Sequence, residues 1–299
     1  MTLLKTFFQS IYHAIAEYKK HNPLALASST AFFSLFALPP ILIIVSQFLG
    51  TIATPKVVSG RLFTELSNYF GEQSAEQVEH VVSNFQSFAK DDISSIIATL
   101  FFIFVATTLM KMVKDSINLL WGFRPKTNYS FLTALFERFL SVLLLFIAGI
   151  LFLLSLISDS ILTFLSSFLL QYDPELNILS IKSINALFSI LSISVWFSLL
   201  FRTLPNAKSS IKPVLVGGFF TAILFTIGKY ILGRVLINSS IDSIFGASGS
   251  AVLLLLFVFY SSLIFYFGAV FTKIYATAIN QEIKPGFYAV KVNTSEVKS

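Results

Sequence analysis

Few side chains in this 299-residue sequence have the types and spacing that catalysis requires. The chain has no cysteines, so disulfides, thiolate metal sites and cysteine nucleophiles are excluded. Phosphodiester hydrolysis needs a metal cluster or a converging general acid and base, and His13, His21 and His80 fall in separate segments without such partners. No phosphate-binding loop, serine elbow or zinc motif occurs. We therefore expect a protein that is not an enzyme and that uses no metal ion or cofactor.

One lysine could bind a substrate within an apolar segment. Lys229 lies about 15 residues into such a stretch, roughly 22 Å from its start at 1.5 Å per residue. It shares a helix face with Gly218, Ala222 and Phe225. A charge inside a membrane helix is a functional hypothesis by default, but Lys229 is also near enough to the outer boundary to extend its ammonium to water. Both interpretations stay open.

Two adjacent prolines interrupt another apolar stretch. Pro39 and Pro40 leave the carbonyls of Leu35 and Phe36 without helical partners, and such groups are tolerated in a bilayer only where protein or a water-filled cavity receives them. We expect a kinked helix with its small, partly polar face turned inward, either as a binding site or as a kink filled by a neighbouring helix. That face carries Ala27, Thr30, Ala31 and Ser34.

The elements that position these residues are predicted to be membrane spans. With 55% hydrophobic residues, 12% charged residues and a mean hydropathy of +0.80, the composition is typical of an integral membrane protein. A span needs about 20 apolar residues. We therefore predict an all-α polytopic membrane protein with six transmembrane helices and a kinked first helix. The six predicted spans are 27–50, 93–113, 139–158, 184–201, 214–236 and 250–272.

Positive charge predicts the orientation of these helices. Most of the 21 basic residues fall in segments that share one side if the N-terminus is cytoplasmic, as the positive-inside rule requires. We expect both termini in the cytoplasm. The net charge of +6 is then topological, and no nucleic-acid partner is expected.

Three segments outside the predicted bundle have distinct patterns. Residues 1–20 have the periodicity of an amphipathic helix, lying on the inner membrane surface or packed on the protein's own cytoplasmic loops. The outer loop 51–92 predicts a pair of short amphipathic helices. Residues 21–280 would form the six-helix domain, and the tail 281–299 is expected to be disordered. "FGASGSA" at 245–251, which contains Gly246 and Gly249, predicts a closely packed turn rather than a phosphate site.

The chain resembles the virulence factor BrkB / YihY family of bacterial inner-membrane proteins, formerly described as ribonuclease BN-like. The resemblance covers roughly residues 20–280 and rests on four stretches in order. They are "AFFSLFALPPILIIV", "KDSINLLWGFRPK", "LFRTLPNAKSSIKPVLVGGFFTAILFTIGKYIL" and "SSIDSIFGASGSAVLLLLFVFYSSLIFYFGAVFTKIYA". It implies recurring family positions at Pro39 or Pro40, Asn118, Trp121, Arg202, Pro205, Gly217, Gly228, Lys229, Gly246, Gly249, Gly268 and Ala269.

The chain departs from the family pattern in its last span. Where the family has Gly-Ala-Glu, this sequence reads Gly268-Ala269-Val270, and Phe257 replaces the usual tryptophan. Proton or ion coupling through this acid is therefore not expected here.

Two functions of different classes fit these observations. The first is transport or export of a lipid-like or anionic amphiphilic envelope component, with membrane lipids and an export apparatus as partners. The second is a non-transporting scaffold that organises envelope machinery through its loops. The resemblance links the family to envelope integrity and lipid export, which fits either. The candidate cavity residues are Thr30, Ser34, Pro39, Pro40, Lys229, Gly246 and Gly249; the candidate cytoplasmic loop residues are Asn118, Trp121, Arg202 and Pro205. The sequence does not fix the oligomeric state.

Overall fold

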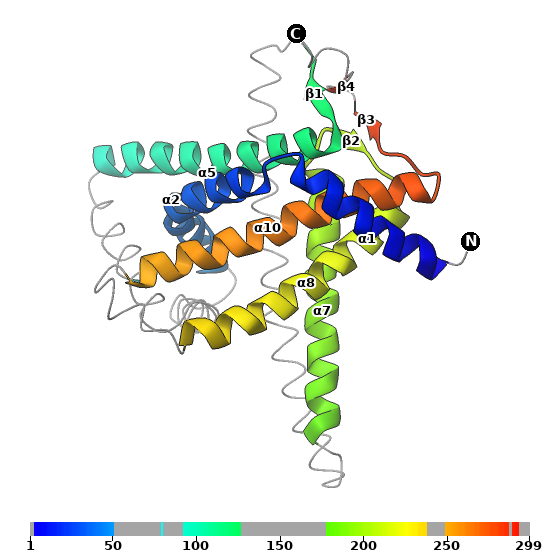
Figure 1. Ribbon diagram of the computed structural model, residues 1–299. Helices are drawn as coiled ribbons and strands as arrows, with labels where there is room; N and C mark the ends of the chain where they lie inside the picture. Colours follow the sequence, from blue (N-terminus) through cyan, green and yellow to red (C-terminus); the bar gives the residue numbers. More distant parts are fainter. Residues whose placement is uncertain are drawn as a thin grey trace.

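The structure, a computed structural model, is mostly helical (Figure 1). It describes residues 3–50, 79, 92–126, 178–237, 249–286 and 289–292. The helices are α1 (Leu3–Lys19), α2 (Pro23–Gly50), α5 (Asp92–Trp121), α7 (Ile178–Thr203), α8 (Ile211–Ile237) and α10 (Gly249–Ala278). The short strands are β1 (Phe123–Pro125), β2 (Ala207–Lys208), β3 (Lys284–Pro285) and β4 (Ala289–Lys291).

Five of the predicted spans coincide with the helices α2, α5, α7, α8 and α10. Three windows in the described residues are long and apolar enough to cross a membrane: Ala186–Thr203, Ile211–Leu232 and Val252–Ala278. The predicted third span, 139–158, and most of the outer loop 51–92 lie outside the described residues. Helix α2 runs through Pro39 and Pro40 as one element. The kink expected at the two prolines stays a prediction, and the side chains of residues 38–50 lie outside the described part of the structure.

α1 and α2 are separated by a tight break at Asn22. Asn22 adopts a left-handed backbone conformation with φ of 49°, which asparagine tolerates better than most residues. Pro23 then occupies the first position of α2, where its missing N–H costs nothing. The chain changes direction at this turn, so that α1 is not collinear with α2 and crosses α10 (Figure 1).

α8 and α10 approach each other through reciprocal glycine–threonine contacts. Thr221 of α8 lies directly over Gly268 of α10, and Thr272 of α10 lies over Gly217 of α8. Each threonine hydroxyl donates to the carbonyl four residues earlier, at 2.7 Å in both cases. Glycine is required at both positions, because a Cβ there would overlap the facing threonine. The pairing sets the spacing of the two helices.

An aromatic core surrounds this helix pair. Phe201 of α7 stacks on Phe265 of α10 at 5.3 Å, and Phe220 of α8 lies 4.2 Å from Phe271 of α10, between ring centroids. Val270 is fully buried in the same cluster, so the apolar residue that replaces the family's acid is part of the core.

The chain after α10 contains strands where we expected a disordered tail. α10 ends in a Schellman arrangement, with Asn280 at φ of 56° and the Gln281 N–H donating to the Ala276 carbonyl at 2.8 Å. β3 then pairs antiparallel with β2, and β4 with β1. Backbone pairing with these two loops therefore orders residues 284–285 and 289–291, whereas residues 293–299 lie outside the described residues.

Candidate functional site

A buried hydroxyl cluster joins α2 and α10. The Thr30 hydroxyl of α2 lies 2.6 Å from the Tyr266 hydroxyl of α10, and both side chains are buried. The Thr30 hydroxyl also lies 3.0 Å from the Leu26 carbonyl, to which it can donate, and either hydroxyl can be the donor in the Thr30–Tyr266 contact. Ser116 of α5 lies within hydrogen-bond reach of the Tyr266 hydroxyl as well. Hydroxyl groups from three helices therefore meet at one point inside the protein.

The predicted small face of α2 explains how Thr30 reaches this cluster. Ala27, three residues before Thr30, and Ala31, directly after it, are almost completely buried, as the inward orientation predicts. Their small side chains allow α2 to approach α10 closely. Ser34, on the same face, is only half-buried.

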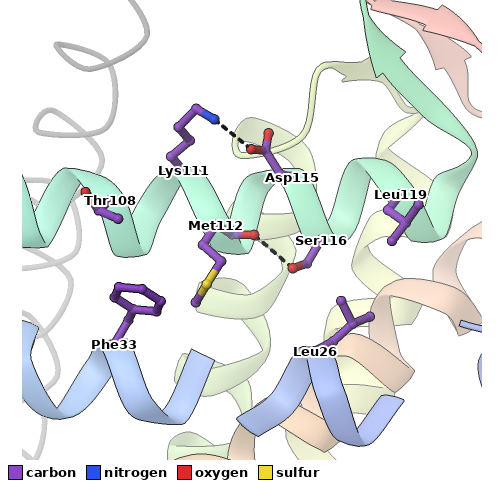
Figure 2. Close-up of a pocket in the computed structure, with 8 residues that line it drawn as sticks. All are labelled: Leu26, Phe33, Thr108, Lys111, Met112, Asp115, Ser116 and Leu119. Carbon is purple, nitrogen blue, oxygen red and sulfur yellow. Dashed lines mark hydrogen bonds and ion pairs between the residues drawn. The ribbon is translucent and has the colours of Figure 1, made fainter. Parts of the chain in front are cut away.

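A groove between α2 and α5 reaches this cluster from the protein surface. It has a volume of about 410 Å³ and is open on one side. Figure 2 shows α2 and α5 side by side, with apolar side chains from both helices along the groove. The lining consists of Leu26, Phe33, Thr108, Lys111, Met112, Asp115, Ser116 and Leu119. Ser116 thus belongs to both the groove and the hydroxyl cluster.

The charged side chains of the groove form an ion pair on α5. Lys111 Nζ lies 3.1 Å from Asp115 Oδ2, a contact that the i, i+4 spacing of the two residues on α5 allows, and both side chains are exposed. An exposed pair of this kind contributes little to stability. Both groups are therefore available to a polar ligand group at the mouth of an otherwise apolar groove.

A second polar cluster joins α1, α5 and α10. Lys273 of α10 donates to the Leu120 carbonyl of α5 at 2.9 Å and lies 3.7 Å from the Glu17 carboxylate of α1. The hydrogen bond from Lys20, at 2.9 Å, is the main reason that the pKa of Glu17 lies below its usual value; burial opposes it, and the charge of Lys273 adds to it. The cluster ties the end of α10 to both neighbouring helices.

Two more long-range hydrogen bonds support this end of the bundle. The Trp121 indole N–H donates to the Ala269 carbonyl at 2.8 Å, and the Tyr18 hydroxyl donates to the Leu263 carbonyl at 2.9 Å. Burial raises the pKa of Tyr18 above the ordinary tyrosine value. Trp121 and Tyr18 therefore fix α5 and α1 against α10 through backbone groups of α10.

The loop residues predicted from the family pattern fall mostly in this region. The Asn118 side-chain oxygen accepts a hydrogen bond from the Asn206 backbone N–H at 2.8 Å, which joins α5 to the loop that contains buried Pro205. Arg202, in contrast, is exposed at the end of α7. Asn118, Trp121 and Pro205 thus have packing contacts, and Arg202 faces outward.

Of the other predicted cavity residues, Lys229 and Gly249 do not line the groove. Lys229 lies half-buried on α8 and has a partner there, and Gly249 is the first residue of α10. Gly246 and the Pro39 and Pro40 side chains lie outside the described residues. Among the residues that the structure describes, no group of three histidines or carboxylates is placed to hold a metal ion.

Sequence reasoning missed Tyr266, Ser116 and the Glu17–Lys273 contact. In the sequence, Lys273 is one of the many basic residues that follow the positive-inside rule, and Tyr266 lies within an apolar run of α10 that offers no local signal. The one available hint was spacing, because Tyr266, Ala269, Val270 and Lys273 share one face of α10. A polar residue at each end of a buried helix face could have identified both clusters.

The chain is similar to bacterial proteins named UPF0761 membrane proteins. It is 27% identical to a UPF0761 membrane protein of Saccharophagus degradans over 90% of this chain and 59% of the relative, and 26% identical to one of Teredinibacter turnerae over 83% and 55%. A UPF0761 protein of Actinobacillus pleuropneumoniae is 23% identical over 91% of this chain and 94% of its own. The chain thus spans less than two thirds of the first two relatives. No solved structure matches it. The family model for virulence factor BrkB matches residues 14–290, and the chain is therefore a membrane protein of the BrkB family.

Proposed function

We propose that this protein binds and moves a lipid-like or anionic amphiphilic component of the bacterial envelope across the inner membrane. The observation that carries the proposal is the open groove between α2 and α5, whose lining combines apolar side chains with the Ser116 hydroxyl (Figure 2). Its volume of about 410 Å³ falls within the range of known small-molecule sites. No step of the proposed function is catalytic.

The lining of the groove suits an amphiphile. Leu26 and Phe33 from α2 and Met112 and Leu119 from α5 offer apolar contacts to an acyl chain. At the mouth, the exposed Lys111 ammonium could exchange its Asp115 partner for an anionic head group. A ligand with one apolar part and one anionic part would use both features at once.

The hydroxyl cluster offers a path for a polar group beyond the groove. Ser116 lines the groove, and Tyr266 and Thr30 lie behind it. A polar head group that moves inward from the mouth of the groove would contact these hydroxyls before the apolar core. Hydrogen bonds to them would lower the desolvation free energy of that movement. Since the sequence contains no ATPase motif, transport would be passive, driven by a gradient or powered by a partner.

The proposed topology has six spans, with α1 at the inner membrane surface and both termini in the cytoplasm. The charge bias of the loops supports this orientation. The groove then opens toward the inner leaflet, because its lining lies in the first part of α2 and the last part of α5.

The scaffold alternative has one specific observation in its favour. The β1–β4 and β2–β3 pairs organise the predicted cytoplasmic loops into an ordered surface, which could dock another protein. A scaffold of this kind would not need a ligand in the groove.

A groove-filling variant distinguishes the two functions. Met112→Trp places a larger ring in the groove, whereas Phe104→Trp adds an indole at an exposed position of the same helix. After mild detergent extraction, native mass spectrometry should show a co-purifying amphiphile on wild-type protein and on Phe104→Trp. It should be largely lost from Met112→Trp. An identical bound population on all three proteins would contradict the proposal.

A further inference from the structure

α1 has two different apolar faces, and one of them packs on the described helices while the other is exposed among the described residues. Ser10, Ala14 and Tyr18 are buried against the bundle. A second face, the outer stripe, consists of Lys5, Phe8, Tyr12, Ile15 and Lys19, which recur at intervals of three and four residues. Its aromatic members are strongly exposed, with Phe8 at 64% and Tyr12 at 74%. In the part of the chain that the structure describes, Phe8 and Tyr12 have ring contacts with their chain neighbours Phe7 and His13, and no other helix covers them.

α1 lies across the end of a predicted span. Phe7 contacts Phe271 of α10 and Phe220 of α8, with ring centroids 5.3 and 5.8 Å apart. Glu17, about 15 Å further along α1, pairs with Lys273, only two residues from Phe271. Phe7 near one end of α1 and Glu17 near the other thus both contact the last part of α10, and Tyr18 reaches further along it to Leu263. α1 crosses α10 (Figure 1). Because α10 contains the apolar window Val252–Ala278, α1 lies across a predicted span, beside the part that faces the cytoplasm in the proposed topology.

The charge of the outer stripe is purely basic. Lys5 and Lys19 stand at its two ends, and the single acid of α1, Glu17, is paired with Lys20 and Lys273 on another face. A stripe of aromatic and aliphatic residues between lysines matches the boundary layer of an anionic membrane. There the rings enter among the head groups and the ammonium groups meet phosphates.

We propose that the outer stripe of α1 binds the anionic lipid surface of the inner leaflet and holds α1 as a surface-bound brace across α10. This inference rests on the proposed membrane topology, but it does not depend on a ligand in the α2–α5 groove. A second copy of the chain would also cover an apolar face, but two basic stripes would repel each other.

The third face of α1 offers a matched control. His13 is exposed, and it lies about 100° around the helix from Tyr12. In the proposed arrangement, Tyr12 faces lipid and His13 faces water. Since the chain lacks cysteine, Tyr12→Cys and His13→Cys each create one labelling site on the full-length protein.

Fluorescence quenching in reconstituted vesicles tests the placement. Each single-cysteine protein carries an environment-sensitive dye, in phosphatidylcholine alone and mixed with phosphatidylglycerol. The label at Tyr12→Cys should be quenched by lipids with a shallow quencher and shielded from aqueous iodide, and phosphatidylglycerol should strengthen this pattern. The label at His13→Cys should show the reverse. Equal access to iodide at both positions would overturn the proposal.

Charge reversal tests the choice of lipid. In Lys5→Glu and Lys19→Glu, the preference for spin-labelled phosphatidylglycerol over phosphatidylcholine should fall by about five-fold per lysine. Lys284→Glu, at an exposed lysine outside α1, should leave the preference unchanged. An unchanged preference in the α1 variants would overturn the proposal, as would a disulfide between two Tyr12→Cys chains that forms equally well in either lipid. Loss of the co-purifying amphiphile from the groove would instead bear on the proposed function alone.

Discussion

A methyl group added at Gly268 tests the contact that sets the spacing of α8 and α10. A Cβ built there would lie 2.9 Å from the Thr221 Cβ and 3.0 Å from its Cγ2, and closer still to Oγ1. Carbon atoms in contact prefer about 3.5–4.0 Å. Rotation of Thr221 could move the hydroxyl only by breaking its 2.7 Å hydrogen bond to Gly217, and it cannot move the Cβ. The helices must therefore separate by roughly half an ångström or more.

That separation should lower the stability of the folded protein. Overpacking of this kind costs about 1–3 kcal/mol, and the higher helix propensity of alanine returns at most about 1 kcal/mol. We expect Gly268→Ala to lower the free energy of unfolding by about 1–2 kcal/mol, measured by steric-trap unfolding in bicelles. Thr221→Gly, which removes the facing side chain, should partly rescue Gly268→Ala.

Gly228→Ala on α8 is the matched control. The three atoms nearest to a Cβ at Gly228 all belong to the far end of the Tyr260 side chain, which can move away by rotation about χ1, so this substitution should cost less than Gly268→Ala. Wild-type stability of Gly268→Ala, or an equal loss in both variants without rescue by Thr221→Gly, would refute the reciprocal packing.

Two further predictions concern the polar clusters. Thr30→Val keeps the shape of the side chain but leaves the buried Tyr266 hydroxyl without its 2.6 Å partner. This loss should lower the free energy of unfolding by about 1–3 kcal/mol in the same assay. Adding Tyr266→Phe should recover part of this cost, and strict additivity of the two substitutions would contradict the pairing. Because the pKa of Glu17 is lowered in the folded protein, its ion pairs stabilise the fold above the ordinary carboxyl value of 4.5, and this contribution disappears as the pH falls through the lower folded value. Glu17→Gln should therefore be less stable than wild type at neutral pH and equally stable in acid, as followed by thermal unfolding at several pH values; a difference that does not change with pH would argue against the pairing.

Local periodicity predicted the helices and their faces. Five predicted spans match described helices, the small face of α2 is buried around Thr30, and the Lys111–Asp115 pair forms as its spacing indicates. Each of these features depends on residues within one or two helical turns. The sequence signal for such features is strong, because lipid exposure and burial repeat with the helix period.

Contacts between residues far apart in the sequence could not be predicted from periodicity. Thr30 and Tyr266 are 236 residues apart, and Tyr18 bonds to a carbonyl 245 residues away. Periodicity shows which face of a helix is buried but not which helix covers it. The strands β3 and β4 escaped prediction for a similar reason, since two or three residues carry no pattern and owe their order to the loops that they pair with.

Photo-crosslinking in cells tests the amphiphile groove most directly. A benzophenone side chain is placed at Leu119, in the groove, or at Phe104, exposed on the same helix. After illumination, mass spectrometry of the purified protein identifies the adducts. We expect Leu119 to capture one class of amphiphile, which disappears when Met112→Trp fills the groove, and Phe104 to capture lipids in proportion to the bulk membrane. If both positions capture the same bulk lipids, and Met112→Trp changes neither, the groove is not a binding site.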